Sequence, residues 1–228
     1  MCRRRPEAKP RPRLTLDQVV QAAVALLDEE GLDGLTTRAL ATRLGVQSPA
    51  IYWYVRDKGE LLDLVADAIC APALEFTAGG GRAGDLSWRA QAATGLRRYR
   101  AVLRSHRDAP RLLAERPPNG PVRRRLADLA VGQILRAGFP ETDAAVISLL
   151  LGDYVISIVN EEFRIQAQAM LSAADGEIPW QGSAEYPNLA RIAPQLAAVK
   201  PDGLFEAGLE VLLDGLEQRL ERLRAAAP

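Results

Sequence analysis

Aromatic and basic side chains are concentrated between residues 36 and 58, and this combination can bind nucleic acid. Tyr52, Trp53 and Tyr54 are consecutive, basic residues stand on both sides of them, and we expect all three rings to face outward. Arginine and lysine neutralise phosphates, hydroxyls bond to the sugar–phosphate backbone, and small apolar side chains contact thymine methyls. The alternative is an aromatic patch in the core or at a protein interface. The residues predicted to contact DNA are Thr37, Arg38, Ser48, Pro49, Ala50, Tyr52, Trp53, Tyr54 and Lys58.

Two short helices around a glycine would present these side chains. Thr36 is a suitable cap for the first helix, and Gly45 can adopt the positive φ that ends it. Ser48 is expected to cap the second helix, with Pro49 at its first position, where a missing N–H costs nothing. Two short helices joined by a glycine turn are typical of a helix-turn-helix, whose second helix enters the major groove of DNA.

No set of residues favours catalysis or metal binding. The chain has one histidine, His106, and lacks a glycine-rich phosphate loop after a strand-like segment. Neighbouring carboxylates such as Glu161 and Glu162 do not face each other on a helix. Cys2 and Cys70 lack the spacing of a metal or redox site and are too few for a disulfide framework. We therefore expect a protein that is not an enzyme, binds no cofactor and keeps its thiols reduced in the cytoplasm.

The composition is that of an ordinary globular protein with an uneven charge distribution. Of 228 residues, 25% are charged and 48% are apolar, enough for a sizeable core. The net charge is zero, but residues 1–58 hold ten basic and seven acidic residues, whereas the remainder holds 19 and 22. A basic end suits contact with nucleic acid. The sequence contains neither about 18 successive uncharged apolar residues nor a secretory signal, so we expect no membrane span.

Helical periodicity throughout predicts an all-α protein with a small N-terminal and a larger C-terminal domain. Residues 14–58 are the predicted helix-turn-helix domain, and 59–76 a connecting helix. Residues 77–86 contain four glycines and are the predicted linker to a larger helical domain at 87–228. Residues 1–13, with six basic residues and three prolines, cannot fold alone. This arm is either a solvated tail or follows the DNA minor groove.

Two helices in the C-terminal part are unusually apolar. Between Ala144 and Val159 the only charged residue is Asp153, so this helix is expected to be buried on every side. The last helix carries leucines at spacings of three and four, with Gly208 and Gly215 seven residues apart. Small residues at that spacing let two helices approach closely. The pattern favours a four-helix interface between two copies of the chain, and the alternative is ordinary core packing.

Residues 14–69 resemble the DNA-binding domain of the tetracycline-repressor (TetR) family. The resemblance rests on Gly-Leu-Asp-Gly-Leu-Thr-Thr-Arg at 31–38, Leu-Gly-Val at 44–46, Tyr-Trp at 52–53, and Lys58 with Leu-Leu-Asp at 61–63. It points to the branch that includes the tetracycline-binding members. The resemblance implies an all-helical homodimer that represses transcription until a small molecule binds the larger C-terminal domain. It also implies that the connecting helix transmits the ligand state to the DNA-binding domain.

The same resemblance indicates where an effector would bind. Ser-His-Arg-Asp at 105–108 is similar to the segment before the pocket in the tetracycline-binding members, but Leu113 stands in place of their magnesium-holding histidine. Gly95 likewise replaces a pocket asparagine. Leucine cannot bind magnesium, so we expect an organic, largely apolar or aromatic effector and no metal. The residues predicted to line the pocket are Tyr99, Leu112, Leu113, Arg116, Leu149, Asp153, Tyr154, Ile158 and Trp180.

Two parts of this pocket are of particular interest. A carboxylate in a buried helix needs a partner, a ligand or water, which singles out Asp153. The irregular segment 172–187 contains Trp180 and is either a lid or a plain surface loop. The predicted function is a ligand-responsive repressor that acts as a homodimer on a palindromic double-stranded DNA operator. The alternatives are an activator with the same DNA-binding domain and a helical ligand-binding protein that does not bind DNA.

Overall fold

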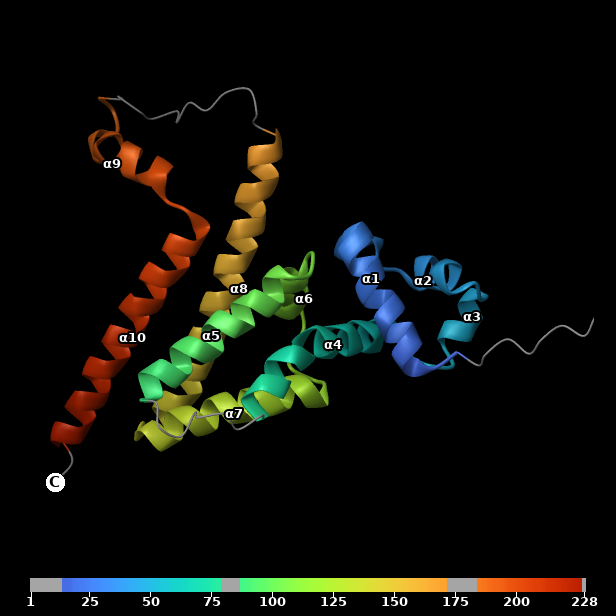
Figure 1. Ribbon diagram of the computed structural model, residues 1–228, viewed down its shortest axis with the longest axis horizontal. Helices are drawn as coiled ribbons and strands as arrows, with labels where there is room; N and C mark the ends of the chain where they lie inside the picture. Colours follow the sequence, from blue (N-terminus) through green and yellow to red (C-terminus); the bar gives the residue numbers. More distant parts are fainter. Residues whose placement is uncertain (1–13, 79–86, 172–183, 227–228) are drawn as a thin grey trace, which may run out of the picture.

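The computed structural model describes residues 14–78, 87–171 and 184–226, and within them the chain is entirely helical (Figure 1). This confirms the all-α prediction. The predicted arm at 1–13, most of the predicted linker and Trp180 lie outside the described residues. The helices of the described part are α1 Leu16–Gly34, α2 Thr37–Leu44, α3 Ser48–Ile51, α4 Lys58–Ala78, α5 Trp88–Arg104, α6 Ala109–Glu115, α7 Pro121–Ala137, α8 Glu141–Leu171, α9 Pro187–Ala198 and α10 Pro201–Ala226.

The first helix, α1, is capped and broken by residues that the sequence identifies. Thr15 Oγ1 accepts a hydrogen bond from Gln18 N at 3.2 Å, and Gln18 Oε1 accepts one from Thr15 N at 2.9 Å. This reciprocal capping box starts the helix. Gly31 has a φ of 76°, so the regular helix breaks there, and one further turn continues to Gly34. The break leaves backbone groups around residues 29–32 available to other parts of the molecule.

Helices α2 and α3 form the predicted helix-turn-helix. Thr36 Oγ1 accepts from Ala39 N at 3.1 Å, and Gly45 ends α2 with a φ of 66°. The predicted cap of α3 is wrong, because the helical backbone already begins at Ser48. Gln47 is the residue before the helix, and its side chain makes no capping hydrogen bond. Small and branched side chains hold the two helices on the core; those buried are Leu40, Ala41, Ile51 and Val55.

Helix α4 connects the helix-turn-helix to the C-terminal helices. Asp57 Oδ1 accepts from Glu60 N at 2.8 Å and so caps its start. Farther along, the buried Asp67 carboxylate accepts hydrogen bonds from two backbone N–H groups at the start of α7, at 3.0 and 3.1 Å. Gly120 precedes α7, and a Cβ built there would lie 2.2 Å from that carboxylate. The two helices are therefore held together where no larger residue fits.

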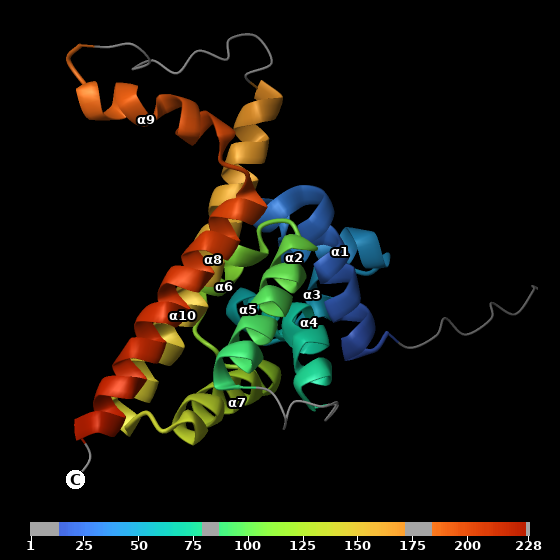
Figure 2. The ribbon, with the colours of Figure 1, turned by 60° about the vertical axis from the view of Figure 1, so that its left-hand side comes forward.

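Helix α10 runs along α5 and α8, as Figure 2 shows. Arg97 on α5 pairs with Glu206 at 2.6 Å. The Tyr154 hydroxyl on α8 donates to the Phe205 carbonyl at 2.6 Å, and the two rings stack with centroids 5.8 Å apart. A Cβ on Gly208 would lie 2.5 Å from the Tyr154 hydroxyl. The close approach at Gly208 is therefore made within the chain and not, as predicted, between two copies.

Helix α8 is long, apolar and only partly covered. Within its segment Glu141–Gln166, the most apolar window of 18 residues has a mean hydropathy of 1.7, so by length and composition alone the helix could span a membrane. A core helix of a soluble protein meets the same criteria. Only 28% of its most apolar window is buried within the chain. The single chain therefore does not bury α8 on every side, and its exposed apolar residues on this helix include Val146, Leu149 and Leu150. Burial on every side would need a second subunit.

Candidate functional site

The helix-turn-helix presents two large aromatic side chains to solvent. Trp53 is 86% exposed and Tyr52 is 54% exposed, directly after the four-residue helix α3. Burying such rings is favourable, so exposure on this scale indicates a surface that meets a partner. The other predicted DNA contacts are divided between exposed Arg38, Pro49 and Lys58 and half-buried Thr37, Ser48 and Ala50.

The four basic residues near these aromatics fall into two groups. Within the described residues, the side chains of Arg38 and Lys58 make no hydrogen bond or ion pair, and both are exposed. Arg43 is instead bound through both terminal nitrogens to Glu29 on α1. Arg56 bonds to the Glu60 carboxylate at 3.2 Å. Arg38 and Lys58 are therefore the side chains best able to neutralise phosphates.

Tyr54 has a structural role that the sequence prediction did not anticipate. Its hydroxyl donates to the Leu14 carbonyl at 2.7 Å, and its ring packs against the core. The prediction that Tyr54 faces outward is therefore wrong. The bond holds the first described residue of the chain beside α3. A hollow of about 320 Å³ lies here, lined by Leu14, Val46, Ala50, Trp53 and Tyr54.

Replacing Lys58 with alanine should weaken binding to all DNA duplexes alike. Lys58 begins α4, where the positive helix end adds to its charge. Losing one phosphate contact should make the slope of log affinity against log salt shallower by about one unit. Fluorescence anisotropy at several salt concentrations measures the slope. Lys200→Ala removes an exposed lysine far along the chain and is the control. A slope that Lys58→Ala leaves unchanged would exclude the contact.

Three residues predicted for the effector site lie in the interior between α5, α6 and their neighbours. Leu112 and Leu113 on α6 are buried. Tyr99 on α5 packs against the same core, and burial raises the pKa of its hydroxyl, so it stays neutral. Burial also raises the pKa of the Cys70 thiol to about 12, which leaves it neutral and unreactive. Ile158 on α8 is half-buried against this core.

Two residues of α8 that were predicted to line the pocket are exposed in the single chain. Asp153 is exposed, so the expected cost of a buried carboxylate does not arise. Leu149 is 69% exposed, on the surface of the single chain. The expectation of burial failed because an apolar helix does not reveal whether the same chain or another chain packs against it.

Arg116 and Tyr154 join helices. Arg116 at the end of α6 donates two hydrogen bonds to the Asp63 carboxylate on α4, both at 2.9 Å, and a third to the Gly59 carbonyl at 3.2 Å. These hydrogen bonds from Arg116 hold the pKa of Asp63 below its ordinary value. Tyr154 fixes the start of α10 through its hydrogen bond to the Phe205 carbonyl. An effector that displaces α6 would therefore pull directly on the connecting helix.

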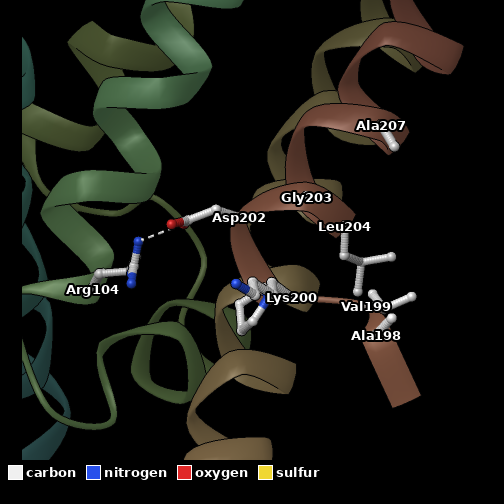
Figure 3. Close-up of a pocket in the computed structure, with 9 residues that line it drawn as sticks. Arg104, Ala198, Val199, Lys200, Asp202, Gly203, Leu204 and Ala207 are labelled. Carbon is white, nitrogen blue, oxygen red and sulfur yellow. Dashed lines mark hydrogen bonds and ion pairs between the residues drawn. The ribbon is translucent and has the colours of Figure 1, made fainter. Parts of the chain in front are cut away.

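An open hollow of about 670 Å³ lies at the junction of α9 and α10 (Figure 3). Arg104 and Asp202 form an ion pair at 3.0 Å beside it, and Lys200 is nearby. None of the predicted effector contacts that lie within the described residues lines this hollow. No motif or spacing in the sequence indicated it.

Sequence reasoning also missed a buried ionic cluster. Arg100 on α5 and Glu162 on α8 are 7% and 4% exposed and are joined by hydrogen bonds of 2.6 and 2.9 Å. Arg100 also bonds to Asp202 at 2.6 Å, and its guanidinium lies 4.4 Å from the centre of the Phe205 ring. This cluster ties α5, α8 and α10 together.

Both the helix-turn-helix part and the C-terminal part of the chain are similar to known proteins. A family model for bacterial regulatory proteins of the tetR family matches residues 19–65, and one for the tetracyclin repressor-like C-terminal domain matches residues 81–220. The chain is 36% identical over 214 residues to tetracycline repressor protein class A from transposon 1721 of Escherichia coli, covering 91% of this chain and 92% of that protein.

Two proteins from Streptomyces are also similar. The HTH-type transcriptional repressor DrrR1 of Streptomyces coeruleorubidus is 31% identical over 226 residues, which cover 94% of this chain and 81% of that one. The crystal structure of the TetR family protein ActR of Streptomyces coelicolor in complex with actinorhodin superposes with a TM-score of 0.73. It is 28% identical and covers 91% of this chain and 99% of that one.

Proposed function

Because the chain belongs to the tetracycline-repressor family of bacterial regulatory proteins, we propose that it represses transcription as a homodimer bound to a palindromic operator. Regulators of this family are not enzymes, and they combine a DNA-binding domain with a C-terminal domain that binds a small molecule. The observation that carries the proposal is the exposed Tyr52 and Trp53 beside exposed Arg38 and Lys58. We assign DNA binding to residues 14–58, and place the protein in the cytoplasm, where its operator would be.

The exposed apolar surface of α8 and α10 supports the homodimer. Val211 on α10 is 72% exposed, and Leu149 and Val146 on α8 are nearly as open. Among the described residues, a Cβ on Gly215 would meet no atom within 4 Å beyond the adjoining part of its own helix, so this side of α10 leaves space for another helix. Pairing these surfaces would bury apolar area that a monomer leaves in water. Two helix-turn-helix units about 34–36 Å apart would then meet successive major grooves.

The buried surface of α6 and the Tyr99 hydroxyl support an effector that is mostly apolar or aromatic. Tyr99, Leu112 and Leu113 supply apolar area, and the Tyr99 hydroxyl makes no hydrogen bond within the described residues. Side chains of this kind suit a mid-sized molecule with few oxygens. Relatives are named for tetracycline, and ActR was crystallised with actinorhodin. Leu113 offers no ligand for a cation, so we propose that the effector binds without a divalent ion.

Selection of duplexes from a random pool tests the repressor proposal and identifies the operator sequence in the same experiment. We expect the wild-type protein to enrich an inverted repeat. Tyr52→Ala should bind this duplex about 10–100-fold more weakly while melting at the wild-type temperature. Failure to enrich any duplex would favour the alternative, a helical ligand-binding protein without DNA binding.

Release of the selected duplex tests the effector. Tetracycline and actinorhodin serve as probes, each with magnesium and with EDTA, and fluorescence anisotropy measures release. An effector that shifts nearly all of the protein from the DNA-bound form must favour the free form by about 10⁴-fold. We expect release by an aromatic probe to persist in EDTA. Release that requires magnesium would contradict the proposal based on Leu113.

A further inference from the structure

The turn between α5 and α6 grips the broken end of α1. Arg107 N donates to the Asp28 carboxylate at 3.0 Å, and His106 Nδ1 lies 3.0 Å from the same group. The Arg107 guanidinium donates to the Glu29 carbonyl at 2.8 Å. Residues of the C-terminal part thus bind both side-chain and backbone groups of the first helix, which lies almost 80 residues earlier in the chain.

The kink at Gly31 makes the grip possible. Beyond it, Leu32 N donates to Asp108 Oδ2 at 2.9 Å. Asp108 itself has a φ of 55°, a conformation that is uncommon for residues other than glycine. A Cβ on Gly31 would lie 2.7 Å from Asp108 Oδ2, so any side chain there would push the turn away. The positive φ of Gly31 and the positive φ of Asp108 therefore lie on opposite sides of the same close contact.

The short helix α6 connects this grip to the interior. Arg111 donates two hydrogen bonds to the Asp33 carboxylate of α1, at 2.9 and 3.0 Å. Leu112 and Leu113, in the same seven-residue helix, are buried in the core where we place the effector. A helix of two turns moves as one body. A shift of the buried Leu112 and Leu113 therefore also moves Arg111 and its contact with Asp33.

We propose that His106, Arg107, Asp108 and Arg111 form a latch on α1 that orients the DNA-binding domain for simultaneous binding of both operator half-sites. The inference rests on the proposed function and adds a second connection to the one through α4. Two DNA-binding domains held in the correct orientation lose less freedom on binding than two that rotate about α4. When only a fraction of molecules holds the competent orientation, the apparent affinity falls by that fraction.

The test compares Asp108→Gly with Asp108→Asn. Glycine adopts a φ of 55° readily but has no acceptor for Leu32 N, whereas asparagine tolerates this φ and retains an oxygen acceptor. Binding is measured to the selected inverted repeat and to a duplex with one half-site. For Asp108→Gly we expect affinity for the inverted repeat to fall about tenfold while half-site affinity is unchanged. Asp108→Asn should bind both duplexes as the wild type does.

Removing one partner of an exposed ion pair provides a second variant that does not threaten folding. Arg111→Ala should weaken binding to the inverted repeat alone, because it removes the two hydrogen bonds to Asp33 and leaves the charge of Lys58 in place. An equal loss of affinity for both duplexes would overturn the latch, because it would show general damage to the DNA-binding domain. Unchanged or tighter binding of the inverted repeat by Asp108→Gly would also overturn it. Wild-type protein that binds neither duplex would refute the proposed function itself, so the two failures are distinguishable.

Discussion

Glu162→Ala is expected to lower the free energy of unfolding by about 3 kcal/mol, the lower end of the range for removing one partner of a buried ion pair. Glu162 is almost fully buried, and its loss leaves the Arg100 guanidinium inside the protein with Asp202 as its remaining ion-pair partner among the described residues. Glu162 Oε2 also lies 3.2 Å from Arg104 Nε, an ion pair without hydrogen-bond geometry. Urea unfolding at a fixed protein concentration measures the loss.

The neighbouring residue offers a matched control. Glu161 is half-buried, with 39% of its side chain exposed, and its ion pair with Arg164 spans one turn of the same helix. Glu161→Ala should change the free energy of unfolding by no more than about 0.5 kcal/mol. Equal effects of the two variants would show that Glu162 is solvated in solution and that the cluster does not hold α5, α8 and α10 together.

Val211→Asp should convert the protein from dimer to monomer at micromolar concentration. In the proposed interface each copy would bury one unpaired carboxylate, at a cost of several kcal/mol per dimer. About 4 kcal/mol corresponds to a rise in the dimer dissociation constant of about a thousandfold. Sedimentation equilibrium measures the constant. The variant should also lose the inverted repeat while keeping the affinity of a single half-site.

Leu135→Asp is the control for added charge. Leu135 lies on α7, is also exposed, and is outside the surface proposed for dimerisation. The Leu135→Asp variant should sediment as the wild type does. If Val211→Asp remained a dimer, the interface would have to lie away from this part of α10.

Local signals in the sequence were enough to predict most of the DNA-binding domain. The capping box of Thr15 and Gln18, the cap at Thr36 and the positive φ of Gly45 each act over a few residues. Such contacts depend on neighbours in the chain, so the residue types alone indicate them. Even here Tyr54 was misplaced, because its hydrogen bond reaches back 40 residues to Leu14.

The C-terminal part was less predictable because its polar contacts join residues far apart in the sequence. Arg100 and Glu162 are separated by 62 residues, and Asp28 and Arg107 by 79. No periodicity indicates which of 29 basic residues meets which acid. Apolar periodicity predicted that α8 would be covered but not by what. That ambiguity is why Asp153 was expected in the interior and is found on the surface.

The uncovered apolar side of α8 also bears on the life of a newly made chain. A newly made chain has Val146 and Leu149 in water, and under the proposed pairing they stay there until it meets a second copy. During that time chaperones and proteases compete with pairing, and pairing depends on the concentration of other copies. At a lower concentration of copies the proposed pairing is slower, so a larger share of the unpaired chains is exposed to proteases. The amount of repressor in the cell should therefore rise more steeply than its rate of synthesis, which gives the regulated genes a sharper threshold than DNA binding alone would.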